Sequence, residues 1–264
     1  MSYTLGRGKV FFAPFKTGTT TPGGERYFGN TPEFSLNVER ETLDHYNSDE
    51  GIREKDDTVP LEVNRSGSFT TDWISLDNVA LFFFGEKATI STAGETVEDE
   101  SLEDVEPGLF YQLGVSESTP TGVRKLAPYA TSPDTVNVKV TDSSGETTYV
   151  EGEDYRIDMD LARLEILNGD ITKGSDILVS YKTAASTREQ VISGSNPIEG
   201  AMRFIAFNPK GANIDYFFPH VSITPNGDYA LKGDEYQTIP FSFEILRKPG
   251  YAAVYVDGRP MGGA

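Results

Sequence analysis

The segment Phe34-Ser35-Leu36-Asn37-Val38-Glu39-Arg40-Glu41 decides the fold of this 264-residue chain. Phe34, Leu36 and Val38 alternate with polar residues, and a period of two is typical of a strand that buries one face and exposes the other. Residues 58–71 repeat this pattern more loosely. The two segments therefore predict two half-buried β-strands.

The stretch between these strands, from His45 to Asp57, is polar and charged. Loops longer than about 12 residues are usually functional or disordered. This one has too few apolar side chains to stay ordered in isolation. With its flanking strands it predicts an extended hairpin whose arm orders on contact with a partner.

One short helix is expected after the second strand. Ser75 can cap its N-terminus, and Gly85 occupies the position after its C-cap. An apolar stripe with helical spacing is formed by Leu76, Val79, Ala80 and Phe83. The rest of the helix surface is also apolar. It must therefore be covered on more than one side, by its own domain or by a neighbouring subunit.

The remaining chain predicts a divided main domain. Residues 1–125 and 188–264 form its two parts, and residues 126–187 form a small inserted β module of short alternating strands. Within the module, Asn168-Gly169 predicts a hairpin turn. The acidic run 94–107 predicts a solvated loop. The tail 254–264 is expected to fray.

Composition supports a mainly β fold. The chain has 13 Tyr, 16 Phe, 26 Gly and 15 Pro, which favours many short strands over long helices. The 41 acidic and 23 basic residues give a formal net charge of −18, which argues against a positive nucleic-acid-binding face. No apolar run approaches the ~20 residues of a membrane helix. Because the N-terminus lacks the apolar segment of a signal peptide, we expect use without secretion.

A search for catalytic chemistry finds no candidate. The absence of cysteine excludes disulfides and thiolate ligands. The two histidines, His45 and His220, lack the spacing of a metal site, and no phosphate-binding loop or nucleophile elbow occurs. Acidic residues are so abundant that neighbouring pairs arise by chance. We expect no catalytic residue, no metal and no cofactor, and so a non-enzymatic protein.

Three segments, in this order, resemble the major tail tube proteins of long-tailed, non-contractile (siphovirus-type) bacteriophages. They are GRGKVFF at 6–12, YFGNTPEF at 27–34, and SLDNVALFFFG at 75–85. In such proteins a hairpin with a long charged arm precedes a short helix, as it does here. The likeness spans nearly the whole chain.

The resemblance implies a tail-tube β-sandwich or barrel domain with one flanking short helix and an inserted small Ig-like β-sandwich module. It implies a structural virion protein, made in the host bacterial cytoplasm, that self-assembles into stacked hexameric rings. The expected partners are other copies of the chain, the tape-measure protein, the tail terminator and distal tail proteins. Viral DNA would pass through the lumen without sequence-specific binding.

The same resemblance suggests roles for three sets of residues. The expected inter-ring contact arm comprises His45, Tyr46, Asn47, Asp49, Glu50, Arg53, Glu54, Lys55, Asp56 and Asp57. The candidates for lining the lumen are Ser35, Asn37, Glu39, Glu41, Glu62, Asn64 and Ser66. The helix stripe defined above is the expected subunit-packing surface. A lumen of this kind would repel phosphate and would offer no positively charged side chain for DNA to bind.

Two alternatives remain open. Another virion component, such as a decoration or tail-terminator protein, would share the β-rich acidic composition but would need no long self-pairing arm. A carbohydrate-binding or glycosidase module would require an aromatic sugar platform, and none is evident in the sequence.

Overall fold

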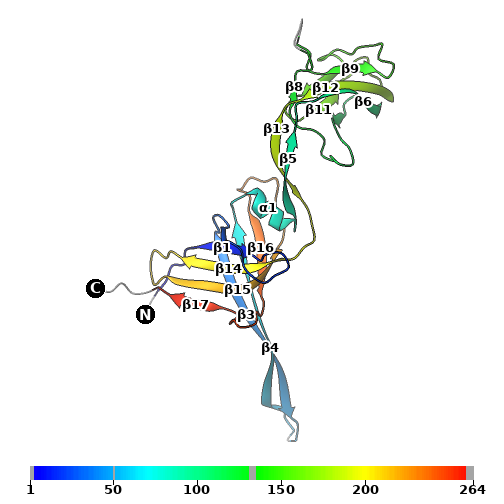
Figure 1. Ribbon diagram of the computed structural model, residues 1–264. Coiled ribbons are helices and arrows are strands. Elements are labelled where there is room, and N and C mark those ends of the chain that lie inside the picture. Colours follow the sequence, from blue (N-terminus) through cyan, green and yellow to red (C-terminus); the bar gives the residue numbers. More distant parts are fainter. Residues whose placement is uncertain (1–2, 50, 131–134, 260–264) are drawn as a thin grey trace, which may run out of the picture. The chain divides into compact units, whose positions relative to one another are not determined.

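The computed structural model describes residues 3–49, 51–130 and 135–259, and it is mainly β (Figure 1). The chain forms two compact units. Unit 1 comprises residues 1–88 and 190–264, and unit 2 comprises Thr89–Glu189. Unit 2 therefore starts well before the expected insert at 126–187 but ends close to where that insert was expected to end.

Unit 1 is built on one antiparallel sheet with the strand order β2-β1-β14-β15-β16-β4-β3, and β17 pairs with β15 beside this path. Its elements are β1 (Gly8–Pro14), β2 (Arg26–Tyr27), β3 (Glu33–Asn47), β4 (Glu54–Thr71), α1 (Leu76–Phe82), β14 (Ile198–Ala206), β15 (Ile214–Pro225), β16 (Ile239–Ile245) and β17 (Tyr255–Gly258). The two strands that were expected to form the hairpin are thus confirmed as β3 and β4. The expectation that the tail frays is wrong for 255–258, which form β17, and 260–264 lie outside the described residues.

The core of unit 1 lies on one face of this sheet and is dominated by phenylalanine. The fully buried rings are those of Phe12, Phe28, Phe69, Phe218, Phe241 and Phe243. Burying each such side chain contributes about 1.5–3 kcal/mol. The aromatic residues noted in the sequence therefore supply the packing that the lean aliphatic content does not.

Helix α1 begins where expected but buries a different face. The Ser75 hydroxyl accepts a hydrogen bond from the Asn78 amide, as an N-cap does. Asn78 and Ala80 are buried, whereas Leu76 and Phe83 of the expected stripe are exposed. A helix of seven residues completes only two turns, so a single stripe poorly describes its contacts.

The C-terminus of α1 also differs from expectation. Phe84, not Gly85, occupies the left-handed position after the C-cap, with φ 49°. The Gly85 amide then donates to the Ala80 carbonyl at 2.8 Å. Glycine is needed at 85 for another reason: a Cβ there would lie 2.1 Å from the Ile192 carbonyl oxygen.

Unit 2 contains two small sheets around one core. The first has the order β6-β12-β8, with β9 also pairing with β12, and the second has the order β10-β11-β7. The strands are β6 (Thr96–Val105), β7 (Phe110–Gln112), β8 (Leu126–Ala127), β9 (Lys139–Asp142), β10 (Tyr155–Asp158), β11 (Arg163–Ile166) and β12 (Ser175–Thr183). Buried side chains of both sheets, among them Leu164 and Ile177, belong to one cluster.

Two sequence-based expectations in unit 2 are wrong. The acidic run 94–107 is not a solvated loop, because most of it forms β6 and pairs with β12. Asn168-Gly169 does not close a hairpin, because the strands on either side of it, β11 and β12, belong to different sheets. A Cβ at Gly169 would lie 2.2 Å from a carboxylate oxygen of Asp154, so this glycine permits a close approach instead.

The chain passes between the units through β5 (Glu86–Thr92) and β13 (Ser186–Ile192). These two strands pair with each other in a separate two-stranded sheet. The segments that enter and leave unit 2 are therefore neighbours.

Candidate assembly surfaces

The polar side chains of β3 and β4 share one face of the sheet. Residues directly opposite each other in an antiparallel pair point to the same side. The register pairs Ser35 with Ser68, and their hydroxyl oxygens are 2.9 Å apart. The same register places all seven lumen candidates on this face: Ser35, Asn37, Glu39, Glu41, Glu62, Asn64 and Ser66.

Strands β16 and β15 extend this surface, which we call the polar face. Ser242 lies opposite Ser68, and Thr224 lies opposite Ser242 with their hydroxyl oxygens 2.9 Å apart. Glu244 and Ser222 form the neighbouring row. These four residues were not among the sequence-based candidates, although the alternation of residues 241–245 (FSFEI) indicates a strand with one polar face. None of the residues named here for the polar face is a lysine or arginine.

The charged arm is an ordered two-stranded ribbon, so the expectation that it lacks structure of its own is wrong. Beyond Ser66, which pairs with Glu244 of β16, only β3 and β4 continue, and their ladder reaches Asn47 and Glu54 (Figure 1). Backbone hydrogen bonds hold this ribbon without requiring a buried apolar face. The arm residues that the structure describes are His45, Tyr46, Asn47, Asp49, Arg53, Glu54, Lys55, Asp56 and Asp57, and Glu50 lies outside the described residues.

Several arm charges are paired within the ribbon. The Lys55 ammonium lies 2.7 Å from Asp44 and holds the pKa of that carboxyl below its ordinary value. His45 hydrogen-bonds Asp56, and this contact raises the pKa of the imidazole. The guanidinium of Arg53 lies over the ring of Tyr46, 5.2 Å from its centroid. These groups are solvent-exposed, so the pairs fix local geometry more than they add stability.

The opposite side of the ribbon is apolar and cationic. We call it the arginine face, and it consists of Leu36, Val38, Arg40, Val63 and Arg65. Val38 is 66% exposed, and the other two apolar side chains are also exposed. Among the described residues, neither guanidinium has a hydrogen-bond or ion-pair partner.

A second set of exposed apolar side chains lies on α1 and at its two ends. We call it the helix patch, and it consists of Trp73, Ile74, Leu76, Asp77 and Phe83. Trp73, the single tryptophan of the chain, is 61% exposed. Asp77 lies 3.3 Å from the Lys87 ammonium and is half exposed. Of the expected helix stripe, Leu76 and Phe83 thus face solvent, Ala80 is buried, and Val79 packs on the core.

Beneath the helix patch, Asn78 makes buried polar contacts that were not expected from the sequence. The Asn78 amide donates to the carbonyls of Phe28 and Trp73, both at 2.8 Å, and accepts from the Arg26 guanidinium at 2.7 Å. Burial lowers the pKa of Arg26, although nearby Asp77 partly opposes this shift. A lone Asn between apolar helix residues was the only sequence signal for this contact.

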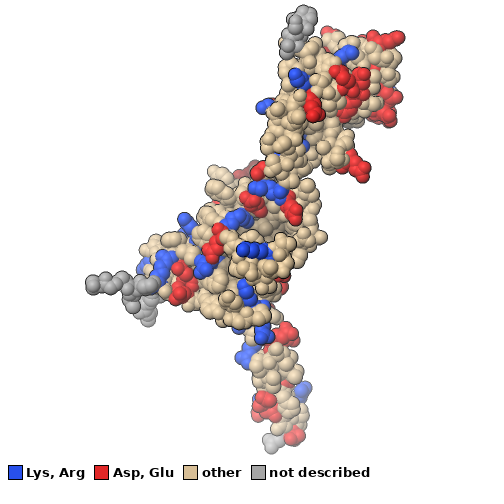
Figure 2. All heavy atoms as spheres, viewed as in Figure 1, with Lys and Arg blue, Asp and Glu red and all other residues tan. Residues whose placement is uncertain are grey.

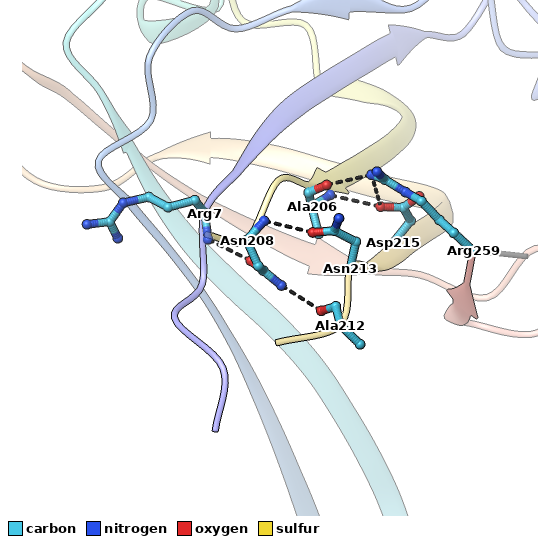
Figure 3. A network of polar contacts seen from close by, with 7 residues as sticks. All are labelled: Arg7, Ala206, Asn208, Ala212, Asn213, Asp215 and Arg259. Carbon is cyan, nitrogen blue, oxygen red and sulfur yellow. Dashed lines mark hydrogen bonds and ion pairs between the residues drawn. The ribbon is translucent and has the colours of Figure 1, made fainter. Parts of the chain in front are cut away.

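A network of polar contacts joins the end of β14, the start of β15 and the end of β17 (Figure 3). Arg259 donates to both carboxylate oxygens of Asp215, at 3.0 and 3.1 Å, and to the Ala206 carbonyl. This contact lowers the pKa of Asp215. Asn208 accepts from the Arg7 amide at 2.8 Å, so the same network fixes the start of β1.

Negative charge is concentrated in unit 2. Residues 89–189 hold 20 Asp and Glu against 8 Lys and Arg, a net −12 of the chain's −18. Figure 2 shows acidic side chains gathered over this unit. The acidity of the chain is therefore mainly a property of unit 2 and only partly one of the polar face.

Two observations concern the metal-ligating and histidine side chains of the described residues. No group of three or more His, Asp or Glu side chains among them could hold a metal ion. His220 packs against the Phe15 ring and lies 3.1 Å from Glu199, in keeping with a packed residue. No helix in the described part of the chain has the length and hydropathy to cross a membrane.

Together these features define a mainly β protein with one curled antiparallel sheet, a projecting ribbon and a second β unit. The chain belongs to the family described as protein of unknown function UCP028589, whose model matches residues 3–254. No curated protein sequence matches the chain.

Proposed function

We propose that this chain is the subunit of a phage tail tube, in which hexameric rings stack into a conduit for DNA. The observation that carries the proposal is the polar face. It spans four neighbouring strands, and its named residues supply hydroxyls, amides and carboxylates but no cation. Such a wall repels phosphate and offers DNA no site at which to bind and stall.

The ribbon supports self-assembly of this kind. It extends well beyond the sheet and exposes apolar side chains, including Ile52 near its tip, which is 77% exposed. Exposed apolar patches often mark sites of protein–protein interaction. In the proposed tube the arm contacts the adjacent ring, and its remaining charges select the partner surface.

The free edge of β3 also favours assembly. Among the described strands of unit 1, β3 ends the strand order and pairs only with β4, so one side of its 15-residue backbone has no partner strand. Exposed edges invite strand addition, and closure of strands into a barrel removes them. A ring of subunits whose sheets line a lumen would use this edge.

Unit 2 is proposed to be an Ig-like module on the tube exterior, where its negative charge keeps neighbouring tubes apart. The other expected partners are the tape-measure protein inside the lumen and the terminator and distal proteins at the tube ends. The protein acts in the virion, and no step of this role requires catalysis or a cofactor.

Negative-stain electron microscopy of the purified full chain, combined with sedimentation analysis, tests the proposal. We expect rings or hollow tubes with six-fold symmetry. A strictly monomeric protein across a wide concentration range would contradict it. A protein that binds or cleaves glycans as a monomer would favour the alternative of a carbohydrate-active module.

A further inference from the structure

Two exposed surfaces of unit 1 have no role in a lumen wall or in the tip of the arm. One is the arginine face of the ribbon, and the other is the helix patch. Each combines large exposed apolar side chains with charge. The arginine face lies on β3 and β4, and the helix patch lies on α1 and the residues at its two ends.

The arginine face requires an acidic and apolar partner. Leu36 and Val38 are successive residues on this side of β3, and Val63 lies on the same side of β4, opposite Arg40. Arg40 and Arg65 lie on this same side and lack polar partners among the described residues. A guanidinium beside apolar side chains is well suited to a carboxylate at a partly desolvated contact.

The helix patch has the complementary composition. Trp73, Ile74 and Leu76 form its apolar part. Asp72 and Asp77 flank these residues in the sequence. Asp77 is exposed, and Asp72 is half-buried and accepts a hydrogen bond from Asn30 at 2.6 Å. Tryptophan is enriched at the centres of protein interfaces, where a large rigid side chain fills a pocket.

We propose that the arginine face of one copy packs against the helix patch of a second copy. This inference rests on the proposed self-assembly and names the two surfaces that carry the lateral contact. The contact is heterologous, because it joins two different surfaces of identical chains. Each copy therefore retains one free surface of each kind, and the chain of contacts ends only when a ring closes.

The experiment uses full-length chains altered on one surface at a time. The ribbon variant carries Arg40→Glu and Arg65→Glu, and it retains an intact helix patch. The helix variant carries Ile74→Asp and Leu76→Asp, and it retains an intact arginine face. All four side chains are at the surface, so folding is expected to be preserved and is checked by circular dichroism. Lys139→Glu, at an exposed lysine of unit 2, is the control for charge reversal, because both surfaces belong to unit 1.

Masses are measured by light scattering at low concentration, where the arm contact of a single subunit is weak because it lacks the multivalency of a stacked ring. Each variant alone is expected to be monomeric, with a dissociation constant raised at least about 100-fold by like charge and lost apolar contact. A 1:1 mixture is expected to give a heterodimer and nothing larger. In that heterodimer, Trp73 of the ribbon variant becomes buried, so its emission shifts to shorter wavelength.

Other outcomes would overturn the inference. A ribbon variant that forms homodimers would indicate a symmetric contact between helix patches. Variants that assemble like the wild type, or a mixture that stays monomeric, would place the lateral contact elsewhere while leaving the proposed tube intact. A wild-type chain that never assembles would contradict the proposed function itself.

Discussion

Phe34 of β3 stacks on Phe204 of β14, with ring centroids 5.3 Å apart and an interplanar angle of 25°. These strands are separated in the sheet order by β15, β16 and β4. The contact therefore exists only because the sheet curls round its phenylalanine core. It also ties the base of the ribbon to the opposite side of unit 1.

Phe34→Ala should destabilise unit 1 by about 2–3 kcal/mol, somewhat less than the about 3–5 kcal/mol of a fully buried phenylalanine. Urea unfolding followed by Trp73 fluorescence, at a concentration where the chain is monomeric, measures the change. Leu231→Ala, at a residue that is 73% exposed, is the control and should stay within about 0.5 kcal/mol. Equal effects of the two substitutions would show that the contact between Phe34 and Phe204 does not stabilise the curled sheet.

Asn78→Ala should cost about 1–3 kcal/mol, because it removes the hydrogen-bond acceptor of the Arg26 guanidinium and one of the two side-chain donors to the buried Phe28 carbonyl. The same urea titration reports it. Asn168→Ala, at an exposed asparagine of unit 2, should change little. If Asn78→Ala were as mild as this control, water would have to satisfy the freed groups.

The pKa of His45 should exceed its ordinary value of 6.5 because of the hydrogen bond to Asp56. A raised pKa in the folded state means that His45 stabilises the ribbon fully below the unfolded pKa. This contribution disappears as the pH rises through the folded pKa. A proton NMR titration measures the value, and Asp56→Asn should bring it back toward 6.5. A wild-type pKa at or below 6.5 would show that the contact does not form in solution.

Replacing residues 45–57 with Asn-Gly should leave a folded chain that cannot polymerise. Asp44 and Thr58 face each other across the ladder, so a two-residue turn can join them without disturbing the sheet. Electron microscopy and sedimentation report assembly, and circular dichroism reports folding. Normal tubes from this shortened chain would remove the arm from the proposed inter-ring contact.

The alternation at 34–41 and its looser repeat at 58–71 were enough to predict β3 and β4 and which of their residues share the polar face, because the two faces of a strand are fixed by a local period of two. The length of the ribbon was not predictable in this way. Its outer part is held by backbone hydrogen bonds and cross-strand charge pairs, and the register shifts after Glu41 and His45 interrupt the alternation.

Strand β6 was not predicted from the sequence, because register shifts interrupt its alternation as well. Asp99 and Asp104 adopt left-handed backbone conformations, with φ 52° at each, where the register with β12 shifts. Each bulge changes which side chains point inward. Val97, Leu102 and Val105 therefore reach the core without an alternating pattern, and the many carboxylates between them suggested a loop.

Because β5 pairs with β13, unit 2 is an insertion whose two ends lie side by side in the structure. Because its entry and exit strands are adjacent, the module can be excised or exchanged by rejoining two neighbouring points of the backbone. Excision would remove two thirds of the net negative charge and leave unit 1 at −6. The site between Ala88 and Gln190 is therefore a natural place to graft a foreign domain with close termini onto each subunit.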